Sequence, residues 1–254
     1  MLDVEMHFDI TNGLFNIFNK TDPSQVYYLY NGDTFNKQIL FFMKMISTKD
    51  KQISDGYTNC YTEMTNLISN NTKIKITEEV IDAALAYGKQ GKSTLDKRFC
   101  AFFCSQLLQI ESSYNPEIIK RFVSLHSETE KIIRREVGFQ MGFIAKEKDV
   151  TFFHKNFLNI IYLYLDDSDL SVRTQTIISS IKNLDRVYDD DNFLKKLIGV
   201  MIDLFEDDKI ENKEYKVKAT KVVKIILEES MNRIKIAQIL EKVVKVIFKV
   251  KINN

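Results

Sequence analysis

The sequence contains few of the residues that interrupt helices. Only two prolines and eight glycines occur among 254 residues. Proline breaks a helix interior and glycine weakens it, so both residue types mark turns. Their scarcity predicts long helices joined by short turns, and the content of 44% hydrophobic and 28% charged residues provides enough apolar material for a core.

Other features that are rare or absent in the sequence argue against several classes of protein. Three cysteines, an odd number, fit a reducing compartment without structural disulfides. The first residues contain no apolar run typical of a signal peptide, and no segment is long and apolar enough to insert into a membrane. The net charge of +1 argues against a general nucleic-acid binder. We therefore expect a soluble intracellular protein, in the cytoplasm or in an organelle.

One pattern of apolar and small residues occurs three times. From Leu95, Ile133 and Val172, matching residues follow at offsets of 4, 5, 8, 9 and 12. The copies begin 38 and 39 residues apart. A helical hairpin of this length cannot bury its apolar face alone, so a repeat of this period indicates stacked hairpins. We predict an all-α, right-handed superhelical solenoid of about five to six hairpins.

The predicted array occupies residues 32–230. Residues 1–31 are assigned to an N-terminal cap or degenerate repeat, and residues 231–254 to a C-terminal apolar helix and tail. Within the array, the spacing of apolar residues predicts helices at residues 35–46, 57–67, 77–88, 95–108, 116–123, 133–145, 152–165, 172–184, 192–205 and 215–229. Thr77 is expected to cap the third of these helices.

Three segments resemble a known repeat family. IRREVGFQMGFIAK (133–146) and DSDLSVR (167–173), together with KRFCAFFC (97–104), resemble HEAT repeats of the protein phosphatase 2A scaffold (A) subunit and of phosphatase 4 regulatory subunits. The resemblance covers about residues 77–187. It implies a ladder of contacts between neighbouring repeats, formed by an acid before each second helix and an arginine after its first apolar residue.

The residues that match this ladder are Glu128, Arg134, Asp167 and Arg173. Two departures predict that the ladder is partial. Asp96 stands at the arginine position of the earlier repeat, and Lys218 with Asn212 replaces the arginine and the acid of the later one.

The resemblance implies a non-catalytic scaffold or adaptor for protein partners, such as a Ser/Thr phosphatase subunit. Exposed turns inside the hairpins are the expected docking sites. The candidate partner-binding residues are Lys92, His126, Glu128, Glu130, Asp166, Asp169, Asp207, Asp208 and Lys209. One alternative is a structural HEAT-repeat subunit of a large stable assembly, and a weaker one is a nucleic-acid-binding helical repeat.

No motif points to catalysis, a cofactor or a metal. GKS (91–93) lacks the earlier glycine of a phosphate-binding loop, and DDSD (166–169) lacks the glycine and the later glutamate of a calcium loop. Cys100 and Cys104 belong to the repeated apolar pattern, which favours core packing over metal binding. The three histidines, His7, His126 and His154, stand at no catalytic motif spacing. We expect a chain that is not an enzyme.

The C-terminal third is polarised in charge. Residues 166–211 contain twelve acidic and six basic residues, whereas residues 213–254 contain eleven basic and four acidic ones. These segments are either solvated faces or complementary docking surfaces. The last helix has apolar residues over more than one stripe. It is therefore predicted to contact another chain through Val244 and Phe248.

Overall fold

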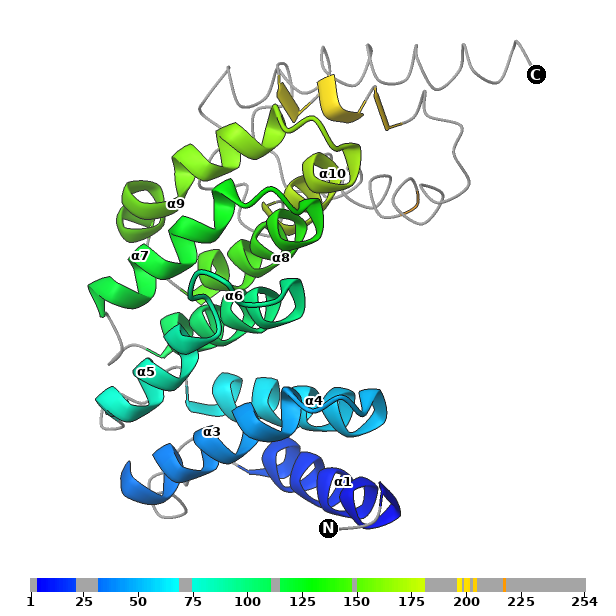
Figure 1. Cartoon of the computed structure of the whole chain (residues 1–254), viewed down its shortest axis with the longest axis vertical. Coiled ribbons are helices and arrows are strands. Elements are labelled where there is room, and N and C mark those ends of the chain that lie inside the picture. The colour runs from blue at the N-terminus through cyan, green and yellow to red at the C-terminus, as the bar shows by residue number, and fades with distance from the viewer. Residues whose placement is uncertain are drawn as a thin grey trace, which may run out of the picture. The chain divides into compact units, whose positions relative to one another are not determined.

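In the computed structural model, the residues described are 4–21, 32–68, 75–110, 115–147 and 150–180, with single residues or short runs at 196–197, 199–201, 203–204 and 217. Within these ranges the regular structure is helical and contains no strand (Figure 1). The predicted all-α class is therefore confirmed for this part of the chain. The chain divides into two compact units, Met1–Leu125 and His126–Asn254.

The first unit contains six of the described α-helices. They are α1 (Val4–Lys20), α3 (Gly32–Ile46), α4 (Lys51–Ile68), α5 (Glu78–Ala86), α6 (Thr94–Gln109) and α7 (Pro116–Ser124). Helices that follow one another pack together, α3 on α4, α5 on α6 and α6 on α7. Helix α1 packs on α4, and α4 also contacts α6. The N-terminal segment, predicted as a cap or degenerate repeat, thus contributes a regular helix.

The helix starts in this unit are explained by local hydrogen bonds. Ser93 and Asp96 form a capping box, in which the Asp96 N–H donates to Ser93 Oγ at 3.1 Å and the Ser93 N–H donates to Asp96 Oδ2 at 3.2 Å. Asp96, which stands where the repeat pattern has an arginine, therefore forms part of a helix cap instead. Asn115 accepts a bond from the Glu117 N–H, with Pro116 in the first turn of α7.

Thr77 occupies the N-cap position of α5, as predicted, but its side chain makes no capping hydrogen bond. Its N–H donates to Asn36 Oδ1 at 2.9 Å, and Asn36 Nδ2 donates to the Lys75 carbonyl at 2.9 Å. Asn36 comes from α3, so a contact between helices replaces the local cap. The sequence pattern at residues 77–79 contains no information about Asn36.

The core of the first unit is rich in aromatic residues, with Phe42, Tyr57, Tyr61 and Phe103 fully buried. Leu95, the first residue of the repeated pattern in this unit, is instead 48% exposed. Helix α6 begins at Thr94, one residue before Leu95, whereas α8 and α10 each begin two residues before their pattern residue. Leu95 therefore lies in the first turn, outside the buried stripe.

The second unit contains α8 (Lys131–Glu147), α9 (Val150–Leu165) and α10 (Leu170–Ser180), and the short 3₁₀ helix η3 (Leu125–Ser127) spans the boundary between the units. Helix α10 packs on both α8 and α9. A Cβ added at Gly138 would lie 2.7 Å from Thr176 Oγ1, and one added at Gly142 would lie 2.7 Å from the Ser179 carbonyl oxygen. Glycine at these two positions therefore allows α8 and α10 to approach closely.

Several predictions fall outside the described residues. They are the end of the helix predicted at 172–184, most of the helix at 192–205, almost all of the helix at 215–229, and the apolar segment at 231–254 with Val244 and Phe248. The turn residues Asp207, Asp208 and Lys209 also lie there. Among the helices that the structure describes, none has the length and apolar content needed to cross a membrane.

Candidate functional site: the polar network of the second unit

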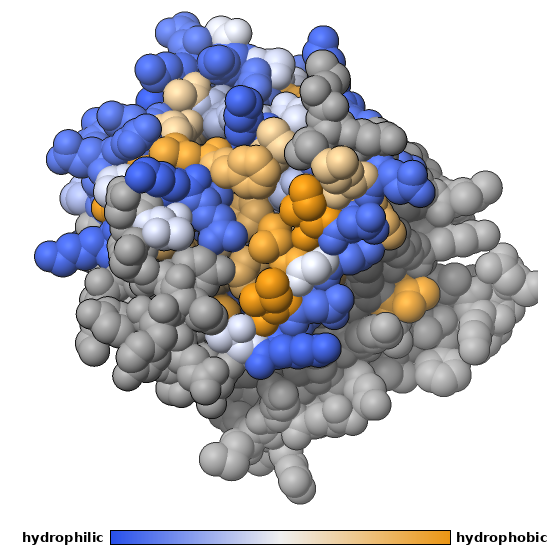
Figure 2. All heavy atoms as spheres, turned by 90° about the horizontal axis from the view of Figure 1, so that it is seen from below, coloured by the Kyte–Doolittle hydropathy of each residue, from blue (hydrophilic) through white to orange (hydrophobic). Residues whose placement is uncertain are grey.

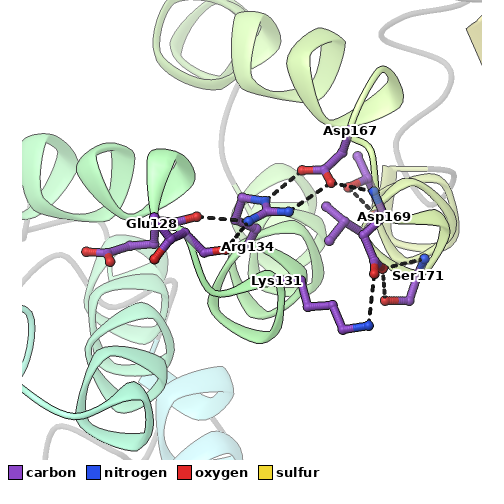
Figure 3. A network of polar contacts seen from close by, with 9 residues as sticks. Glu128, Lys131, Arg134, Asp167, Asp169 and Ser171 are labelled. Carbon is purple, nitrogen blue, oxygen red and sulfur yellow. Dashed lines mark hydrogen bonds and ion pairs between the residues drawn. The ribbon is translucent and has the colours of Figure 1, made fainter.

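Arg134, in the first turn of α8, is the centre of a network of polar contacts (Figure 3). Its Nε donates to Asp167 Oδ2 at 2.7 Å and its Nη2 donates to Asp167 Oδ1 at 3.0 Å. The Arg134 and Asp167 side chains are 15% and 8% exposed. Two parallel charge-assisted bonds in a partly buried place are among the stronger polar contacts in proteins. The hydrogen bond to Asp167 and its charge raise the pKa of Arg134, despite the opposing effect of burial.

The third nitrogen of Arg134 ties down the turn before α8. Nη1 donates to the carbonyl oxygens of Glu128 at 2.9 Å and Thr129 at 2.8 Å. Glu128 was expected to contribute its carboxylate to a ladder between repeats. Toward Arg134 it contributes its backbone carbonyl instead, as Figure 3 shows. One guanidinium thus joins the turn before α8 to the turn before α10.

Asp169 is bound into the same network. Its Oδ1 accepts bonds from the Ser171 N–H at 2.9 Å and the Ser171 hydroxyl at 2.5 Å, and its Oδ2 lies 3.0 Å from Lys131 Nζ. Burial opposes ionisation of the Asp169 carboxyl. The bonds from Ser171 and Lys131 outweigh it and lower the pKa to about 2. Asp169 was proposed as an exposed docking residue, but its carboxylate joins α8 to the start of α10.

Two ion pairs join residues of α10 and of the turn before it to described residues further along the chain. Arg173, at the position in α10 that corresponds to Arg134, lies 3.2 Å from Asp203 Oδ2 through its Nη2. Asp166 pairs with Lys196. The acid that faces Arg173 was not identified from the sequence, where Asn212 was assigned to its place. Asp203 follows Arg173 by 30 residues, which is close to the 33 residues that separate Arg134 from Asp167. This spacing was the signal in the sequence that could have identified Asp203.

The other predicted turn residues remain candidates for docking. Lys92 and Glu130 are exposed, whereas His126 and Glu128 are half-buried. Ser168, in the turn between Asp166 and Asp169, is also exposed beside the network. Of the predicted turn residues that the structure describes, Lys92, Glu130 and Asp166 are exposed, and Asp166 is paired with Lys196.

Helix α8 carries an exposed aromatic residue inside the segment that resembles a HEAT repeat. Phe139 is 42% exposed and meets Phe143 edge to face, with ring centroids 5.1 Å apart. Arg135 lies one turn before Phe139 on the same helix. Aromatic and arginine side chains are enriched among the residues that dominate protein–protein binding energy. This face of α8 is therefore a second candidate for partner contact.

The cysteines occupy core positions. Cys100 and Cys104 are fully buried, with their sulfur atoms 3.8 Å apart. The bond with Cys100 and burial both raise the pKa of Cys104, and burial raises the pKa of Cys60 to about 11. A raised pKa disfavours the thiolate that binds metals or attacks substrates. Within the described ranges, no three His, Cys, Asp or Glu side chains gather as a metal site would require.

The comparisons with known proteins give little further information. No family model and no curated protein matches the chain. Among solved structures, the crystal structure of an engineered protein is similar to 87% of this chain over 92% of its own length, at 13% identity and a TM-score of 0.38. A TM-score this low does not establish a shared fold.

Proposed function

We propose that this chain is a non-catalytic scaffold for protein partners, built from HEAT-type hairpins and resembling the regulatory scaffolds of Ser/Thr phosphatases. In such an array each hairpin stacks on the next, and exposed turns and helix faces present side chains to a partner. The proposal extends the packing of α10 on α8 to a superhelical array of about five to six hairpins.

The observation that carries the proposal is the contact between Arg134 and Asp167. The two residues hold corresponding places, before and after the start of the second helix, in successive copies of the repeat. Arg173, which holds the corresponding place in α10, also pairs with an acid further along the chain, Asp203, although Asp203 lies in a helix rather than in a turn. The family resemblance implies such a ladder between neighbouring repeats, and a ladder of this kind holds hairpins at a constant spacing.

The chemistry of the network also favours a structural rather than a catalytic role. Asp167 accepts two bonds from Arg134 and one from the Asp169 N–H, and Asp169 is bonded to Ser171 and Lys131. These acids are engaged by side chains and backbone of their own unit. A general base needs a lone pair directed toward a substrate.

Affinity purification of the full chain from its own cells, followed by mass spectrometry, tests the proposal. A Ser/Thr phosphatase catalytic subunit among the captured proteins would support it in its specific form. A constant set of subunits at fixed stoichiometry would support the structural-subunit alternative instead. Binding that nuclease treatment abolishes would contradict both and favour the nucleic-acid alternative.

Variants locate the docking surface. Glu130→Lys with Ser168→Lys changes the charge of exposed turns, and Phe139→Ala removes the exposed aromatic ring on α8. Asp82→Lys, an exposed charge reversal within α5, is the matched control. We expect reduced partner capture from the first two variants and wild-type capture from the control. Equal capture by all three would show that the partner binds elsewhere on the chain.

A further inference from the structure

Helix α1 has an unusual distribution of polar and apolar residues. Its buried side includes His7, whose Nδ1 lies 3.0 Å from the Tyr57 hydroxyl, and Thr11, whose carbonyl accepts a bond from the Cys60 thiol at 3.2 Å. Large apolar side chains are instead exposed, including Met6 at 48% and Ile17 at 54%. Figure 2 shows apolar side chains gathered in a stripe between polar ones, on the face that carries α1.

Part of this exposed surface has the spacing of a helix-pairing seam. Met6, Ile10, Gly13 and Ile17 follow one another at intervals of 4, 3 and 4 residues, which places them on one face of α1. A Cβ added at Gly13 would meet no atom within 4 Å, so the middle of the seam is open. Phe8 and Phe15 lie on the other flank of α1 and do not belong to this seam.

The charges of α1 specify the direction in which a second helix would pair with it. Glu5 and Asp9 lie in the N-terminal half and Lys20 lies at the C-terminal end, and all three are exposed. A parallel pair of α1 helices would place like charges beside each other. An antiparallel pair places the acids of each helix beside the lysine of the other.

We propose that α1 is a homodimerisation surface, and that its seam packs antiparallel against the same seam of a second copy of this chain. In a two-fold arrangement Met6 meets Ile17 of the second copy and Ile10 meets Gly13, because both pairs are symmetric about one point on the helix. With a rise of 1.5 Å per residue, Glu5 lies within about 3 Å, along the axis, of Lys20 of the second copy. Gly13 lets the two backbones approach at the crossing.

Sedimentation equilibrium of the full chain over a range of concentrations tests the pairing. We expect a monomer–dimer equilibrium for the wild type. Ile17→Asp should raise the dissociation constant by at least about tenfold, because each substitution occurs twice in a two-fold interface. Leu163→Asp, at a residue of α9 with a matched exposure of 56%, should leave the dissociation constant unchanged. A wild type that stays monomeric at every concentration would overturn the proposal.

Charge exchange provides a second test that does not depend on the apolar residues. Glu5→Lys and Lys20→Glu should each weaken the dimer, and the double variant should restore it because the opposite charges meet again. Both residues also favour α1 itself, as an acid in its first turn and a base in its last. If Glu5 and Lys20 act only by stabilising α1, the double variant should dimerise more weakly than either single variant. That result would refute the antiparallel pairing.

Discussion

Removing Asp167 should destabilise the second unit more than its position in a turn suggests. Asp167→Leu deletes the acceptor of two bonds from Arg134 and of the Asp169 N–H bond at 2.9 Å. It leaves the Arg134 guanidinium, 15% exposed, without its charge partner. Loss of one partner from a buried ion pair costs about 3 kcal/mol, and we expect a loss of about that size here.

A double-mutant cycle with Arg134→Met measures the interaction free energy between Arg134 and Asp167 separately from their other contacts. Arg134→Met alone should cost about 3 kcal/mol, because Asp167 is then left largely buried and without its partner. The double variant should also cost about 3 kcal/mol, rather than about 6, because no buried charge is left without a partner. The remaining cost comes from the Glu128 and Thr129 carbonyls and the Asp169 N–H, which lose their hydrogen-bond partners. The expected coupling free energy is therefore about 3 kcal/mol.

Urea unfolding followed by far-UV circular dichroism measures these free energies, and amide hydrogen exchange of residues 131–180 assigns the loss to the second unit. Arg134→Lys is an informative intermediate, because lysine keeps the charge but not the bidentate geometry. If the single-variant losses add to the double-variant loss within about 0.5 kcal/mol, the pair does not couple α8 to the turn before α10, and the reasoning fails.

Two further predictions follow from the same unit. Gly138→Ala should destabilise by about 1–3 kcal/mol, because its Cβ would lie 2.7 Å from Thr176 Oγ1, and adding Thr176→Ala should recover part of the loss in the same urea assay. The Asp169 carboxyl has its pKa lowered from 3.8 to about 2, so its contribution is present above pH 3.8 and is lost as the pH falls toward 2. Because Lys131 is largely exposed, solvent screening reduces the contribution of this shift to about 1 kcal/mol, and Asp169→Asn, which keeps the hydrogen bond to the Ser171 N–H, should remove that part of the acid sensitivity. An unchanged pH profile in Asp169→Asn would show that other carboxyls cause the acid loss.

The sequence predicted most helices of the described ranges because each has a buried stripe with helical spacing. The helix predicted at 95–108 extends over Thr94–Gln109, and that at 133–145 over Lys131–Glu147. The beginnings of the helices were predicted unevenly, because α7 begins at Pro116 as predicted whereas α4 begins at Lys51, six residues before the predicted start at Tyr57. Leu95 is exposed since α6 begins one residue late relative to the repeated pattern. A periodic pattern records which face is buried, whereas the first turn depends on a few specific hydrogen bonds.

Contacts between residues far apart in the chain were mostly beyond the sequence. His7 stands at no motif spacing, yet it lies buried against Tyr57, 50 residues later. Asp169 was read as a solvated acid because Lys131, its partner, belongs to a different helix. The Arg134–Asp167 contact was anticipated only through the family resemblance. Asn212 was assigned as the next acid position by extending the repeat spacing, but the acid that pairs with Arg173 is Asp203, a helical residue that lies earlier in the chain.

We expect partners to bind helix faces rather than turns, because the turn acids are already bonded within the chain whereas apolar side chains on two helices are exposed. In the second unit, the turn acids Asp167 and Asp169 already have their carboxylates bonded, so a partner that used them would first have to break those contacts. Phe139 on α8 and the seam around Met6 and Ile17 on α1 are apolar and exposed, so covering them removes apolar surface from water without breaking an internal bond. We therefore expect association on one helix face of each unit, whereas the acids of the turn before α10 hold α8 and α10 together.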